Sequence, residues 1–120
     1  MDVKNKRVVV TGAASGIGKA LCEAFHQAEA QSVIAVDMNL DGAQETADSV
    51  DGIAVQANVG NEKDIINVIE KADEHLGGTD IFCSNAGIGG VPGFFEVAAS
   101  DWQNIWDVNV QSHILSLIHI

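Results

Sequence analysis

The apolar residues of this chain fall into short runs that are separated by longer segments with helical periodicity. Four runs, at residues 7–11, 33–36, 53–57 and 80–84, have the length of β-strands. The first run is apolar without alternation, which is typical of a strand that is buried on both faces of a sheet. The segments between the runs carry apolar residues three and four positions apart, as amphipathic helices do. We therefore expect strands and helices to alternate along the chain.

The predicted helices have apolar stripes and recognisable ends. Asn39 and Asn61 are expected to be N-caps, and Gly77 is expected to end the third helix. Ser100 and Gln103 are expected to form a capping box at the start of the fourth helix. The stripes consist of Ile17, Leu21, Ala24, Phe25 and Ala28 in the first helix, Leu40, Ala43, Ala47 and Val50 in the second, and Ile65, Ile69, Ala72 and Leu76 in the third.

This alternation predicts the fold class. Strands separated by helices of about a dozen residues form βαβ units with a parallel sheet. We predict an α/β fold, a Rossmann-like doubly wound parallel sheet of about four strands in the order 3-2-1-4 with flanking helices. Residues 1–120 contain no repeat or linker and are expected to belong to a single domain.

Composition excludes several classes of partner. The chain has 17 acidic and 6 basic residues, a formal charge of -11, which argues against a nucleic-acid or anionic-membrane surface. No apolar run approaches the roughly 18 residues of a spanning helix, and the N-terminus does not resemble a secretory signal. The histidines have no metal-ligand spacing, so no metal site is expected. Cys22 and Cys83 form no disulfide framework and are expected to pack in the core of a cytoplasmic protein.

A glycine-rich segment, Thr11-Gly12-Ala13-Ala14-Ser15-Gly16-Ile17-Gly18, leaves the first predicted strand and enters the first predicted helix. Gly12 allows a sharp turn, Gly16 lets the backbone approach a pyrophosphate, and Gly18 lets the helix pack closely. The helix N-terminus then holds the phosphates through its free N–H groups. One glycine would suit an ordinary turn, whereas three at these offsets favour a dinucleotide site.

Asp37 ends the second predicted strand, 25 residues after Gly12. A carboxylate at this point can accept hydrogen bonds from both hydroxyls of an adenosine ribose, and it would repel a 2′-phosphate. The next residue is Met38 rather than arginine, so NAD is favoured over NADP. The alternative interpretation is a local one, in which Asp37 helps to cap the helix that follows Asn39.

Further motifs resemble those of the short-chain dehydrogenase/reductase family, in its compact single-domain branch. Asn58-Val59 stands where the family usually has Asp-Val, a pair that contacts adenine. Ser84-Asn85-Ala86-Gly87 resembles the family's Asn-Asn-Ala-Gly, with serine at the first position, and the segment 107–110, Asp-Val-Asn-Val, resembles the one that carries the catalytic asparagine. The resemblance covers residues 7 to about 114. It implies cofactor contacts at Gly12, Ser15, Gly16, Ile17, Gly18, Asp37, Met38, Asn58, Val59, Asn85, Ala86 and Gly87.

Asn109 is the candidate catalytic residue. It shares a predicted helix face with Trp102, Ile105 and Trp106, and an amide on such an apolar face needs hydrogen-bond partners. The residues alone favour a side chain that is satisfied by the backbone. The resemblance implies instead that Asn109 holds a water molecule in a proton relay.

The chain has no tyrosine, and its last lysine is Lys71. The resemblance implies hydride transfer between NAD and a small alcohol or carbonyl substrate, with a tyrosine and a lysine that follow a fifth strand. We therefore expect an N-terminal fragment, inactive alone, of an oxidoreductase whose full-length form is a homo-oligomer. The alternatives are a non-catalytic NAD- or adenosine-binding module and a translation product without function.

The last six residues, 115–120, do not continue the helix as the family does. They match a translation of the transposon-end adapter used in sequencing libraries. We expect residues 115–120 to be an artefactual tail. The alternative is a genuine apolar helix end.

Overall fold

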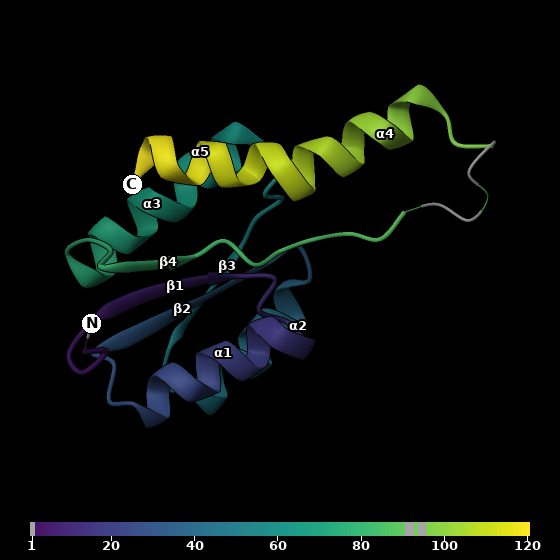
Figure 1. Cartoon of the computed structure of the whole chain (residues 1–120). Coiled ribbons are helices and arrows are strands. Elements are labelled where there is room, and N and C mark those ends of the chain that lie inside the picture. Colours follow the sequence, from purple (N-terminus) through teal and green to yellow (C-terminus); the bar gives the residue numbers. More distant parts are fainter. Residues whose placement is uncertain (1, 91–92, 94–95) are drawn as a thin grey trace.

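A computed structural model describes residues 2–90, 93 and 96–120 of the chain. Its centre is a sheet of four parallel strands (Figure 1). The strand order β3-β2-β1-β4 confirms the predicted α/β topology. Val9 of β1 lies opposite Ile34 of β2 and Phe82 of β4. The strands are β1 (Arg7–Thr11), β2 (Ser32–Asp37), β3 (Ile53–Gln56) and β4 (Ile81–Cys83).

Helices cover both faces of the sheet. Helices pack against either face, and the helix at 99–106 extends past the sheet (Figure 1). The helices α1 (Gly16–Gln27) and α2 (Leu40–Ser49) share the first face, α3 (Glu62–Leu76) and α5 (Ser112–His119) share the second, and α4 (Ala99–Trp106) is the extension. A π-helical segment, η1 (Asp107–Gln111), joins α4 to α5. No helix within the described ranges combines the length and apolar character needed to cross a bilayer.

Strand β1 is buried on both of its faces, as its sequence predicts. Val8 and Val10 pack with Cys22 of α1 on one side, whereas Val9 packs with Val68 of α3 on the other. All five side chains are 0% exposed. Since each face of the strand is covered by helices, an unbroken apolar run is stable there.

The two cysteines pack as predicted. Cys22 is fully buried, and Cys83 is partly buried against the same core cluster. Burial raises the pKa of the Cys22 thiol to about 11, with a smaller contribution from Cys83. Both side chains are therefore neutral packing groups at physiological pH.

Three of the predicted helix ends are confirmed. The Asn39 side chain accepts a hydrogen bond from the Gly42 N–H at 3.2 Å, and the Asn61 side chain accepts one from the Lys63 N–H at 2.9 Å. Gly77 ends α3 with φ 75°, a left-handed conformation that glycine adopts without strain.

The stripe predicted for the first helix is partly wrong. Ile17 is 73% exposed, and Ala24 and Ala28 are also exposed, whereas Gly18 and Cys22 are buried. The glycine turn sets the rotation of α1, because Gly18 packs directly against the turn that precedes it. The prediction for α2 holds at Ala43, Ala47 and Val50, and fails at Leu40, which is 41% exposed.

The capping box predicted at Ser100 and Gln103 is also wrong. Helix α4 begins at Ala99, so Ser100 lies inside its first turn. The Asp101 carboxylate accepts a hydrogen bond from the Ala98 N–H at 3.0 Å, while Gln103 donates to Asp107 at 2.7 Å. A carboxylate satisfies this N-terminal amide in place of the expected glutamine because the N-cap is Ala98, two residues before Ser100.

Candidate dinucleotide-binding site

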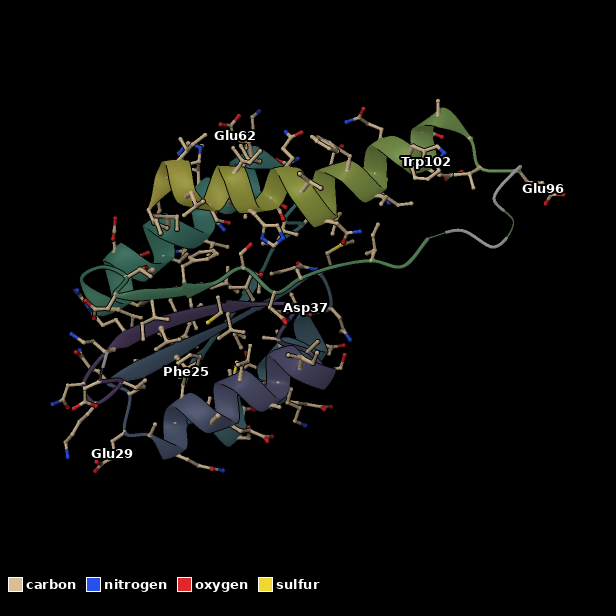
Figure 2. All side chains as sticks on the ribbon, in the orientation of Figure 1. Phe25, Glu29, Asp37, Glu62, Glu96 and Trp102 are labelled. Carbon is tan, nitrogen blue, oxygen red and sulfur yellow. The ribbon has the colours of Figure 1, made fainter. Side chains whose placement is uncertain are left out.

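The predicted site residues follow the carboxyl ends of the four strands. The glycine turn follows β1, Asp37 ends β2, Asn58 comes after β3 and Asn85 comes after β4. The sheet order is β3-β2-β1-β4, so these groups lie side by side at the carboxyl-end edge of the sheet. Their order in space along this edge is Asn58, Asp37, glycine turn, Asn85. The direction of chain connection reverses between β1 and β4, and ligands of doubly wound sheets bind at such a point. Figure 2 shows Asp37 at this edge.

A pocket of about 120 Å³ opens along the same edge. Its walls come from the ends of all four strands and from η1. The lining residues are Gly12, Asp37, Met38, Ala57, Asn58, Val59, Ala86, Gly87, Ile88 and Val108. The structure therefore brings seven of the predicted cofactor residues around one hollow, together with Ala57, Ile88 and Val108.

The three glycines of the turn occupy positions that other residues would disturb in different ways. Gly12 and Gly16 have φ of 71° and 54°, in the left-handed region. A Cβ on Gly18 would lie 1.9 Å from the Gly12 carbonyl oxygen, so only glycine allows this contact. A Cβ on Gly16 would meet nothing within 4 Å. Gly16 thus borders open space, as a backbone that receives a phosphate must.

The start of α1 fits an anionic group. Its N-cap residue, Ser15, makes no capping hydrogen bond through its side chain, and the first turn has no acidic residue. The amides of a first helical turn have no partner inside the helix, and the helix dipole adds positive potential at this end. This local donor set can hold a pyrophosphate in a chain whose overall charge is -11.

Asp37 connects the glycine turn to the end of β2. Its Oδ2 accepts a hydrogen bond from the Ala14 N–H at 3.0 Å, and its Oδ1 accepts one from the Asn39 N–H at 2.9 Å. The local capping interaction is therefore present. Each carboxylate oxygen keeps a further lone pair, so Asp37 also retains the capacity to accept from ribose hydroxyls.

The β3 side of the site is held by a compact turn. The Asn58 N–H donates to Asp64 Oδ2 at 2.9 Å, and Asn58 Oδ1 accepts from the Gly60 N–H at 3.0 Å. Val59 is 6% exposed and packs with Ile65 of α3. Asn58 itself is exposed, so its side chain, rather than that of Val59, is the accessible member of the pair.

The β4 side is braced against the end of β1. Thr11 Oγ1 accepts hydrogen bonds from the N–H groups of Asn85 and Ala86 at 3.0 and 3.1 Å. The Asn85 side chain donates to the Thr11 carbonyl at 2.9 Å. Asn85 and Ala86 thus tie the segment after β4 to the end of β1. The contact of this segment with a cofactor stays a prediction.

Asn109 lies in the π-helical segment and faces the chain that follows β4. Its Oδ1 accepts from the Ile88 N–H at 2.8 Å, and its Nδ2 donates to the Ile88 carbonyl at 2.9 Å. The amide is therefore satisfied by the backbone, which is the interpretation that the residues alone favoured. The neighbouring Trp102 and Trp106 are 51% and 53% exposed, so the face they share with Asn109 is not buried.

Sequence reasoning missed several residues that hold the site together. Thr46 of α2 donates to the Ala13 carbonyl at 2.8 Å and so ties the glycine turn to a second helix. His113 Nδ1 and Ser84 Oγ lie 2.6 Å apart, at the position where serine replaces the usual asparagine. Thr11 opens the glycine-rich segment, but its hydrogen bonds to Asn85 and Ala86 were not predicted. Thr46 and His113 carry no sequence signal, because tertiary packing alone gives them their partners.

The fold is that of a Rossmann-like domain, and the predicted site residues lie at the carboxyl ends of its strands. The family model described as short chain dehydrogenase matches residues 6–119 of the chain. The chain therefore belongs to the short-chain dehydrogenase family of oxidoreductases, whose members generally bind nicotinamide cofactors.

Individual relatives agree with this assignment. Glucose 1-dehydrogenase 2 of Bacillus subtilis (strain 168) is 33% identical over 120 residues, which cover 95% of this chain and 46% of that protein. A structure described as a putative short-chain alcohol dehydrogenase from Sinorhizobium meliloti 1021 has a TM-score of 0.90 at 28% identity, over 98% of this chain and 48% of that one. A short-chain type dehydrogenase/reductase from Mycobacterium marinum has a TM-score of 0.87 at 31% identity, over 98% and 49%. The chain thus spans about half the length of these relatives.

Proposed function

We propose that this chain is the cofactor-binding part of an NAD-dependent oxidoreductase that acts on a small alcohol or carbonyl compound. The observation that carries the proposal is the alignment of Asn58, Asp37, the glycine turn and Asn85 along one sheet edge. This order matches the order of chemical groups in a dinucleotide: base, ribose, pyrophosphate and second nucleoside. From this order we assign cofactor contacts to Ser15, Ile17, Met38 and the other predicted residues of the edge.

The preference for NAD over NADP rests on Asp37. Its carboxylate lies beside the backbone of the glycine turn, where the adenosine ribose would enter. A 2′-phosphate there would meet a negative charge, and the segment 11–18 contains no basic side chain to balance it. The exposed Met38 that follows supplies none either.

The nicotinamide ring supplies the hydride chemistry when the cofactor is bound. Asn109 and the brace at Asn85 would border that ring, because both lie at the β4 end of the edge. The 120 residues hold no tyrosine to donate or accept the proton at the substrate oxygen. We therefore propose that this chain binds the cofactor and does not turn over by itself.

A non-catalytic NAD- or adenosine-binding module is the second candidate function. Binding of this kind needs only the residues at the carboxyl ends of the strands and no tyrosine. We place the protein in the cytoplasm, where Cys22 and Cys83 stay as thiols, and we expect a homo-oligomer for the form that spans the full length of the relatives.

Calorimetric titration of the 120-residue chain with NAD and NADP tests the proposal. We expect NAD to bind at least about tenfold more tightly, since the loss of a charged hydrogen bond has about this effect. Asp37→Asn should reduce the ratio of the affinity for NAD to the affinity for NADP. Asp41→Asn, an equal charge change on an exposed residue of α2, should leave this ratio unchanged. Equal affinity of the wild-type chain for both cofactors would reject the role of Asp37. A complete lack of nucleotide binding would reject the proposed function.

A further inference from the structure

The orientation of the Asn58 side-chain amide is fixed by its surroundings. Its Oδ1 faces the Gly60 N–H at 3.0 Å, and an N–H group can donate only to the oxygen of an amide. A flipped amide would set two donors against each other and lose this hydrogen bond. The Asn58 N–H is itself held by Asp64 at 2.9 Å, so the backbone at this point is anchored as well.

The group that Asn58 presents outward is therefore the donor, Nδ2. Among the residues that the structure describes, none accepts a hydrogen bond from it. Asn58 is exposed and lines two adjoining hollows, of about 120 and 350 Å³. The first is shared with Asp37 and the second with Met38, Gln56 and Asp64.

The sheet order decides which part of a ligand meets this donor. Asn58 follows β3, the strand beyond β2 and Asp37, so it lies past the ribose position and away from the phosphates. The base of the nucleotide is the group that reaches this point. This step rests on the proposed function, because it takes Asp37 as the ribose contact.

We infer that the outward Nδ2 of Asn58 donates to an acceptor of the purine, so that binding does not depend on the 6-amino group. Adenine offers ring-nitrogen acceptors and a 6-amino donor, whereas hypoxanthine offers a 6-oxo acceptor at the same place. A carboxylate at position 58 would accept from the 6-amino group and repel the 6-oxo group. The neutral amide of Asn58 repels neither base, so a dinucleotide with a 6-oxopurine base binds as readily as NAD.

Titration of the 120-residue chain with NAD and with nicotinamide hypoxanthine dinucleotide tests this inference, since the two differ only at the purine. We expect dissociation constants within about threefold of each other, because a donor at residue 58 finds an acceptor on either base. Asn58→Asp should favour NAD by about tenfold or more, through acceptance from the 6-amino group and repulsion of the 6-oxo group.

Asn61→Asp is the matched control. Asn61 accepts from the backbone N–H two residues ahead, as Asn58 does, and gains the same charge, but it lines neither hollow. It should leave the ratio of the two affinities unchanged. Asn58→Ala serves as a second variant that needs no added charge, and it should weaken both dinucleotides by similar factors.

The outcomes separate this inference from the proposed function. A wild-type preference for NAD of tenfold or more over the hypoxanthine analogue would overturn it, even if NAD still binds better than NADP. An unchanged ratio in a folded Asn58→Asp chain would overturn it too. If neither dinucleotide binds, the proposed function fails and the inference fails with it.

Discussion

The side chain of Asn109 forms hydrogen bonds in both directions with the backbone of Ile88, 2.8 Å to its N–H and 2.9 Å to its carbonyl. Through this pair, the π-helical segment η1 holds the chain that leaves β4, which forms one wall of the candidate site. π-helical turns are often found at functional sites. Asn109 is thus a positioning group for the pocket wall.

Replacing Asn109 by alanine should loosen this wall without unfolding the sheet. The Ile88 N–H would lose its acceptor and face water, so its hydrogen exchange should become at least about tenfold faster. Amide exchange followed by NMR measures this directly. Asn104→Ala is the control, since Asn104 is exposed on α4 and far from Ile88 in the chain. Equal exchange at Ile88 in all three proteins would show that the pair does not order the wall.

Gly16 and Gly18 should respond differently to alanine. Gly18→Ala places a methyl group 1.9 Å from the Gly12 carbonyl, so the turn must move, and we expect a loss of about 2 kcal/mol or more in unfolding free energy. Gly16→Ala meets open space and has only the strain of φ 54°, about 1 kcal/mol.

Urea unfolding followed by circular dichroism distinguishes the two variants. Gly16→Ala should nonetheless weaken the binding of NAD, because its methyl group occupies the space beside the helix N-terminus. Should Gly18→Ala prove as stable as wild type, the close packing described for α1 would be incorrect.

The ion pair between Arg7 and Asp80 should make stability depend on pH. Hydrogen bonds from the Arg7 side chain, and then from its backbone N–H, hold the pKa of Asp80 well below its ordinary 3.8. A depressed folded-state pKa stabilises the protein above the unfolded value, and this contribution is lost as pH falls through the folded-state value.

The urea midpoint of Asp80→Asn should therefore lie below that of wild type at pH 7, and the difference should shrink only below about pH 4. Glu45→Gln, on the exposed surface of α2, should show no such difference. A gap that stays constant down to pH 2.5 would contradict the role of ionised Asp80.

Cys22 should resist alkylation in the folded chain. Its side chain is 0% exposed, and burial raises its pKa to about 11, so at pH 7.5 about one thiol in three thousand is ionised. Burial raises the pKa of the partly buried Cys83 as well. Mass spectrometry after a short iodoacetamide pulse should find Cys22 unmodified, and both cysteines modified in guanidinium. Rapid labelling of Cys22 in native buffer would mean that α1 opens from the sheet.

The strands and their order could be predicted because their signals are local and repeated. The unbroken run Val8, Val9, Val10 and the caps at Asn39 and Asn61 each follow from the chemistry of a few neighbouring residues. The position of Asp37 after β2 was equally visible. Its two hydrogen bonds to the backbone were not, because they depend on how the glycine turn folds back across the sheet edge.

The errors arose where tertiary contacts override periodicity. Ile17 fits a helical stripe by spacing, yet the contact between Gly18 and Gly12 rotates α1 and leaves Ile17 exposed. Ser100 and Gln103 have capping-box spacing, but the helix N-terminus is capped by Asp101, whose carboxylate accepts a hydrogen bond from the Ala98 N–H. Neither outcome can be predicted from one sequence, since each depends on contacts that form only in the folded structure.

The π-helical segment at 107–111 has a consequence for the register of the whole C-terminal helix. A π-turn contains one more residue than an α-turn, so every later side chain is displaced by about 100° around the axis. This phase shift directs Leu115 toward Ile65 of α3, while Trp106, before the shift, remains exposed. Removing one residue between 107 and 111 would restore a uniform α-helical phase. The Leu115 side chain would then rotate away from α3 and toward solvent. The helix therefore behaves as two segments with separate faces, and insertions or deletions at this point exchange one face for the other.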